Sequence, residues 1–147
     1  MEDNIMWPFN SGPKYKTIKM TPTGLWNIML KAGISNFPMG LLNGTYYTTD
    51  DAGWANVLTS LVGGPWLYQA EITDCDWFAL NACVVCRQKF KLNAIGMVIG
   101  NSPGGRHSFN LIVTPTGVHL FEPQFNLSTW GAFDLGSNGY TVDMVLI

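Results

Sequence analysis

The feature that most limits how this chain can fold is the segment from Cys75 to about Phe90, which is apolar on nearly every side. This character comes from residues spread around the whole helical circumference, namely Trp77, Phe78, Leu80, Ala82, Val84 and Val85. A surface helix carries one apolar stripe, whereas a helix that is apolar all round is normally buried on most sides. We therefore predict a central helix that the rest of the chain has to cover.

The sequence after this helix has the character of a β-sheet. We predict strands at 94–100, 107–114, 118–121 and 140–147, with a tight turn at Pro115-Thr116 that joins the second and third strands into a hairpin. Before the central helix we expect a helix at 25–32 capped by Thr23, a helix from Asp51 to about Leu61, and short strands near 15–20 and 45–48. Helices followed by an antiparallel sheet of about four to five strands predict an α+β fold.

Length and charge narrow the classes of function. The 147 residues are the size of one domain, in which 1–22 form an irregular N-terminal arm broken by prolines. A net charge of −2 gives no electrostatic reason to expect nucleic acid. No apolar run reaches the ~20 residues of a membrane helix, and the acidic start Met1-Glu2-Asp3 predicts no signal peptide. Three cysteines cannot all pair, so a reducing, cytoplasmic environment is expected.

A cysteine, a histidine and a carboxylate each lie at the edge of a different predicted element. Cys75 opens the central helix, His107 begins a strand 32 residues later, and Glu122 follows the hairpin after a further 15 residues. A thiol nucleophile needs a base to take its proton and a third group to orient that base. The positive end of the helix dipole would also favour the thiolate of Cys75. The order therefore favours a Cys75-His107-Glu122 catalytic triad.

The hairpin turn fixes which of these side chains can meet. If Thr114 pairs with Gly117, then Phe109 lies opposite Glu122 and His107 lies opposite Gln124. Because side chains alternate between the two faces of a sheet, His107, Glu122 and Gln124 share one face and His119 falls on the other. A turn that is one residue longer would move Glu122 to the wrong face.

Less specific interpretations stay open at each position. Cys75 could be a buried structural cysteine, and His107 with Glu122 could be a structural ion pair. Cys83 and Cys86 have a spacing seen in zinc sites, but zinc needs four ligands and the two histidines are expected on opposite faces. The cysteine pair is therefore better explained as part of the helix core.

The three motifs together resemble a known family. Asp74-Cys75-Asp76, Arg106-His107-Ser108-Phe109-Asn110 and Glu122-Pro123-Gln124 are similar to the papain-like and transglutaminase-like cysteine peptidase superfamily. The resemblance is greatest to the papain-like protease domain of certain fungal agglutinins and to related small bacterial and phage proteins. It covers roughly residues 69–124, which would form the catalytic-like core.

The resemblance implies roles for further residues. Gln69 lies six residues before Cys75, the spacing of the oxyanion glutamine in papain-like enzymes, and Tyr68 is the alternative donor. Gln124 matches a polar residue near the site. The family is activated by calcium or manganese, for which Asp76 is the candidate ligand, although the residues themselves require no cofactor. The second acid that often follows the cysteine in this family is replaced here by Trp77.

Two functions are expected from these observations. The first is a cysteine-dependent amide hydrolase, meaning a peptidase, an isopeptidase or an acyl transferase, that acts on a peptide or protein and is located in the cytoplasm or in a virus particle. The alternative is a non-catalytic binding or structural protein that keeps the fold, since many aromatic and few charged residues suit an interaction surface. A homo-oligomer or a complex with a protein partner is compatible with both.

Overall fold

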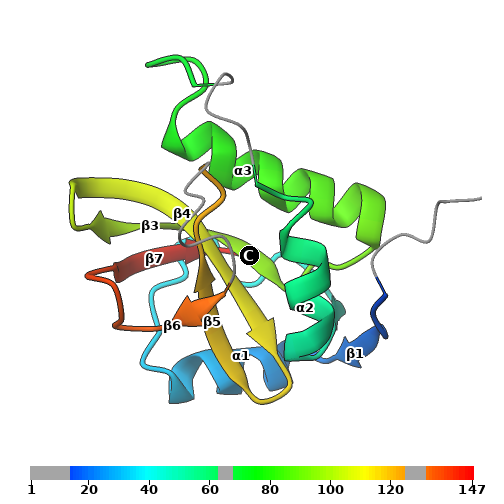
Figure 1. The fold of residues 1–147 in the computed structure, drawn as a ribbon. Helices are drawn as coiled ribbons and strands as arrows, with labels where there is room; N and C mark the ends of the chain where they lie inside the picture. Colours follow the sequence, from blue (N-terminus) through cyan, green and yellow to red (C-terminus); the bar gives the residue numbers. More distant parts are fainter. Residues whose placement is uncertain (1–13, 63–67, 125–131) are drawn as a thin grey trace, which may run out of the picture.

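The computed structural model describes residues 14–62, 68–124 and 132–147 (Figure 1). Within these ranges, three α-helices accompany a five-stranded antiparallel sheet and a separate two-stranded sheet. The helices are α1 (Pro22–Lys31), α2 (Asp51–Leu58) and α3 (Cys75–Val85). The strands are β1 (Ile18–Met20), β2 (Tyr46–Thr48), β3 (Ile95–Ser102), β4 (Gly105–Thr114), β5 (Gly117–Phe121), β6 (Phe133–Asp134) and β7 (Thr141–Leu146). The predicted α+β class and antiparallel sheet are confirmed.

Helices cover both faces of the large sheet, whose strand order is β6-β5-β4-β3-β7 (Figure 1). Leu25 and Met29 of α1 pack on one face in a cluster with Phe109, Leu111 and Val113 of β4. Helices α2 and α3 pack on the opposite face, in a cluster that contains Trp54, Ala82, Ile112 and Phe121. Alternate residues of β4 thus belong to two separate cores, as the period of a strand requires.

The N-cap of helix α1 lies two residues before the predicted one. Thr21, rather than Thr23, is the N-cap, and its hydroxyl oxygen accepts a hydrogen bond of 3.0 Å from the amide of Gly24. Pro22 then occupies the first helical position, where its fixed φ angle fits the helix and its missing N–H costs nothing. The predicted irregular arm therefore already contains β1 and the first residue of α1, while its residues 1–13 lie outside the described ranges.

The central helix changes its winding before it ends. α3 continues beyond Val85 as a five-residue π-helix, Cys86–Phe90, and the chain then turns at Lys91, whose φ angle is 56°. Leu80 and Val84 are exposed, so one stripe of α3 faces outward and the prediction of burial holds only for the remaining sides. No helix in the described ranges is both long and apolar enough to span a membrane.

A buried amide joins α3 to the sheet. The Nδ2 atom of Asn110, a fully buried residue of β4, donates to the carbonyl oxygens of Ala79 at 2.9 Å and Gly96 at 3.1 Å. The same amide nitrogen also lies 3.4 Å from the sulfur of Cys83. Because unpaired polar groups are costly to bury, these bonds fix the position of α3 relative to β3 and β4.

Candidate functional site

The predicted pairing of His107 with Glu122 is present in the structure. Thr114 pairs with Gly117 and Asn110 with Phe121, which is the register expected for the two-residue turn. Glu122 follows β5 directly, and its Oε2 lies 2.7 Å from Nε2 of His107. Two residues widely separated in the sequence are therefore brought together by the hairpin geometry that the sequence predicted.

Glu122 is almost wholly buried, and its three hydrogen-bond partners in the described ranges are donors or can be donors. Its Oε2 also accepts a hydrogen bond of 2.9 Å from the hydroxyl of Tyr140, and its Oε1 accepts one of 3.0 Å from the backbone amide of Gln124. A buried carboxylate with several donors avoids most of the cost of leaving water. The backbone amide of Gln124 thus contacts Glu122, and the role expected of the Gln124 side chain stays a prediction.

Tyr140 completes this cluster, and the sequence did not identify it. Its ring packs edge-on against Phe109 with a centroid distance of 5.0 Å and against His107 at 6.2 Å. Burial, followed by the charge of Glu122 and the hydrogen bond to it, raises the pKa of the Tyr140 hydroxyl well above its usual value. The hydroxyl consequently stays protonated and acts as a donor to the carboxylate.

Cys75 approaches the sheet from the other side. It is the first residue of α3, is partly buried, and belongs to a helix that packs on the face opposite to α1. His107 lies on the α1 face, where its ring stacks on Phe109 at 6.0 Å. Although both residues are in the described part of the chain, no hydrogen bond joins the sulfur of Cys75 to the ring of His107. The structure thus unites two members of the predicted triad, and the catalytic role of Cys75 stays a prediction.

The residues before α3 form a short turn. Gln69 and Thr73 make an isolated antiparallel bridge, with hydrogen bonds of 3.1 Å and 2.7 Å between their backbone groups. Glu71 in the middle of the turn has a positive φ angle of 64°. Tyr68 is 47% exposed. The turn holds the backbone of Gln69, and the oxyanion role of either residue stays a prediction.

Asp76 lies in an acidic cleft at the start of α3. Glu71, Asp74 and Trp77 also line this cleft, whose volume is about 370 Å³. A hydrogen bond that the protonated carboxyl of Asp76 donates to the side chain of Asp74, with smaller contributions from burial and from the charge of Asp74, raises the pKa of Asp76. Among the residues that the structure describes, no group of three or more histidine, cysteine or acidic side chains is arranged to hold a metal ion. Metal binding at Asp76 is left as a prediction.

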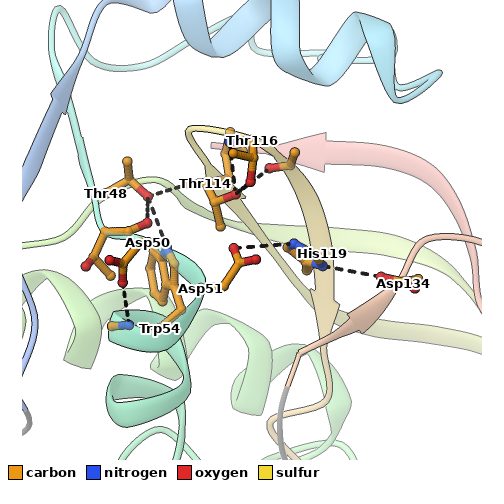
Figure 2. Close-up of polar contacts among 12 residues, drawn as sticks. Thr48, Asp50, Asp51, Trp54, Thr114, Thr116, His119 and Asp134 are labelled. Carbon is orange, nitrogen blue, oxygen red and sulfur yellow. Dashed lines mark hydrogen bonds and ion pairs between the residues drawn. The ribbon is translucent and has the colours of Figure 1, made fainter.

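A second pocket of about 370 Å³ lies on the α2 side of the sheet, around His119 (Figure 2). It is lined by residues from α2, β4, β5 and β6 with their flanks: Asp51, Trp54, Ala55, Ile112, His119, Ala132 and Asp134. We call it the His119 pocket. Because His119 pairs with Ile112 across β4 and β5, its side chain is on the face opposite to His107, as predicted.

The imidazole of His119 lies between two carboxylates. Its Nε2 is 3.7 Å from Oδ1 of Asp51, and its Nδ1 is 3.5 Å from Oδ1 of Asp134 (Figure 2). Both distances exceed the 2.7–3.2 Å typical of a strong hydrogen bond. The ring and the carboxylates can therefore still bond a ligand. The side chains of Asp51 and Asp134 are 65% and 86% exposed, so they form the mouth of the pocket.

The floor of the His119 pocket is apolar and well supported. Trp54 and Ile112 are fully buried. The indole N–H of Trp54 donates to the hydroxyl of Thr48 at 3.0 Å (Figure 2). That hydroxyl in turn donates to the carbonyl of Val113. The carboxylate of Asp50 caps α2 through a bond of 2.7 Å from the amide of Gly53. These contacts hold α2, and with it Asp51, against the sheet.

Comparison with known proteins shows that solved structures share this fold. No protein-family model matches the chain, and no curated protein matches it. Among solved structures, Polyporus squamosus lectin bound to the human-type influenza-binding epitope Neu5Aca2-6Galb1-4GlcNAc is similar with a TM-score of 0.66 and 19% identity over 88% of this chain. PSL1a in a complex with E64 is similar with a TM-score of 0.63 and 20% identity over 88% of this chain. The matched regions are 49% and 51% of those chains, so this chain spans about half their length.

These findings correct the assignment made from the three sequence motifs. The fold is shared with structures of Polyporus squamosus lectin, and the identification of a papain-like peptidase is overturned. The prediction of a cysteine-dependent amide hydrolase, with a peptide as the expected partner, is corrected with it, because the lectin binds a glycan. Three short motifs over about a third of the chain were too little to define a family. The alternative prediction of a binding protein agrees better with these neighbours.

Proposed function

We propose that this chain is a carbohydrate-binding module and that the sugar occupies the His119 pocket. Two observations support the proposal: the fold is similar to that of a lectin bound to a glycan, and the pocket combines polar groups at its mouth with an apolar floor. The lectin is about twice as long as the matched region, so the argument for this chain rests on the pocket itself.

The chemistry of the pocket suits a sugar ring. A pyranose presents apolar C–H groups on its faces and hydroxyl groups around its edge. Ala55 and Ala132 offer exposed apolar groups above the buried Trp54 and Ile112, while the carboxylates of Asp51 and Asp134 accept hydrogen bonds from hydroxyls. His119 can donate from one ring nitrogen and accept at the other. A volume of about 370 Å³ lies within the usual size range of ligand pockets.

The combination of donor and acceptor groups at His119 is the observation that favours this pocket over the acidic cleft. The cleft at the start of α3 has the same volume and a partly exposed indole, but its other polar side chains are the carboxylates of Glu71, Asp74 and Asp76. Two of these carboxylates already interact with each other. Because sugar ring oxygens and acetamido carbonyls accept hydrogen bonds, a site dominated by acceptors suits them less well than one with an imidazole.

The proposal is tested by screening the purified chain against an array of immobilised glycans and then titrating the best ligand by NMR. We expect saturable binding that shifts the ring signals of His119. His119→Ala should reduce the affinity at least about tenfold, because the pocket loses its main donor. Trp77→Ala, in the acidic cleft, is the matched control and should leave the affinity unchanged. Absence of binding to every glycan, or loss of binding only in Trp77→Ala, would contradict the proposal.

A further inference from the structure

The charges around the His119 pocket are of one sign. Its lining includes two carboxylates, Asp51 and Asp134, and neither lysine nor arginine occurs among the lining residues that the structure describes. Both carboxylates are largely exposed at the mouth, so any ligand has to pass close to them. Among the lining residues that the structure describes, His119 is the one basic side chain, and each of its ring nitrogens already faces one of the carboxylates.

We infer that the His119 pocket selects neutral sugars and rejects anionic ones, an inference that rests on the proposed function. A ligand carboxylate at the mouth would lie near two like charges, and the described part of the lining offers no lysine or arginine to pair with it. It would also compete with Asp51 and Asp134 for the same imidazole. A neutral sugar instead donates its hydroxyls to both carboxylates and gains from their presence.

This specificity would separate the chain from the lectin that shares its fold. The epitope bound by that lectin includes Neu5Ac, a sugar that carries a carboxylate. The same epitope without Neu5Ac is the neutral disaccharide Galb1-4GlcNAc. The two ligands therefore form a matched pair that differs by one charged sugar. We expect the His119 pocket to bind the disaccharide at least about tenfold more tightly than the sialylated trisaccharide at low salt, with a smaller ratio at high salt.

Two isosteric variants with the same change in net charge test whether the pocket carboxylates cause the preference. Asp134→Asn removes a negative charge at the mouth of the pocket, and it should be tolerated because its side chain is 86% exposed. Asp143→Asn also removes a negative charge, but on β7 at the opposite edge of the sheet, where Asp143 is paired with Arg106. The affinities of both glycans are measured by calorimetry for the unmodified chain and for each variant.

The inference predicts that Asp134→Asn narrows the ratio between the two affinities several-fold and that Asp143→Asn leaves it unchanged. Equal affinities, or tighter binding of the sialylated glycan by the unmodified chain, would overturn the inference while the proposed function stands. An equal narrowing in both variants would also overturn it, because net charge rather than the pocket would then set the preference. If neither these two glycans nor any sugar on the array binds, the proposed function itself fails and the inference falls with it.

Discussion

The hydroxyl of Tyr140 donates to the same oxygen of Glu122 that lies 2.7 Å from the ring of His107. Tyr140 precedes the edge strand β7, whereas Glu122 follows β5, and two other strands separate β7 from β5 in the sheet. This one carboxylate therefore links the two sides of the sheet on the face covered by α1. The structural role of the link can be measured without reference to any ligand.

Replacing Glu122 should destabilise the fold. Glu122→Ala leaves the Tyr140 hydroxyl and the Gln124 amide without their acceptor in a buried setting, for which we expect a loss of about 2–4 kcal/mol in the free energy of unfolding. Urea denaturation followed by circular dichroism measures this loss. Glu71→Ala, at an exposed residue in the turn before α3, is the control and should change stability by less than about 0.5 kcal/mol. Similar stabilities of the two variants would refute a structural role for Glu122.

The raised pKa of Tyr140 predicts a specific pH dependence. Its contribution to stability is fully present below the unfolded tyrosine value of about 10 and is lost as the pH rises through the higher folded value. The unmodified chain should therefore lose stability above pH ~10 more steeply than Tyr140→Phe, whose side chain does not titrate. Near neutral pH the variant should be about 1 kcal/mol less stable, because one hydrogen bond is missing. Parallel stability curves between pH 9 and 11 would count against this account.

The three cysteines should react at different rates. Burial is the main cause that raises the pKa of Cys83 and of Cys86 to about 12, whereas Cys75 is partly exposed at the start of α3. Iodoacetamide at pH 8 should label Cys75 first, and the two buried thiols should react only on unfolding. Peptide mass mapping over time measures the order, and Cys75→Ser should remove the fast phase. Equal rates at all three positions in the folded chain would show that the helix is not packed as described.

The buried amide of Asn110 should contribute more to stability than a surface amide. Asn110→Ala removes the donor to Ala79 and Gly96 and leaves a small cavity, which should cost about 2–4 kcal/mol. Asn101→Ala removes the exposed bond of 3.2 Å to Thr141 and should cost less than about 1 kcal/mol. Chemical denaturation of the two variants provides the comparison. A smaller loss in Asn110→Ala than in Asn101→Ala would contradict the role given to the buried amide.

Local patterns predicted those parts of the structure that depend on neighbouring residues. The turn at Pro115-Thr116 determined the register of β4 and β5, and this register placed His107 beside Glu122. The N-cap of α1 was missed by two residues, because Thr21 and Thr23 are both good caps and only the position of Pro22 decides between them. The winding change after Val85 has no comparable local signal.

The parts that sequence reasoning missed depend on contacts between distant elements. Tyr140 reaches Glu122 only because β7 pairs with β3, a strand order that no short pattern encodes. One pocket contains Asp51, His119 and Asp134 because α2 and β6 both pack beside β5. The sequence alone assigns Asp51 only to the start of a helix. The expected absence of nucleic-acid binding, the oligomeric state and the cellular location stay predictions.

The π-helix at Cys86–Phe90 allows this part of the chain to absorb a change of length. A π turn holds more residues than an α turn of the same rotation. Deleting one residue here would allow ordinary α winding with little change in the direction of the side chains that follow, whereas a deletion within α3 would turn them by about 100° around the axis. Phe90 would then keep its place beside Tyr15, whose hydroxyl donates to the Phe90 carbonyl at 2.7 Å. Homologous chains should therefore differ in length by one residue more readily at these five positions than within Cys75–Val85.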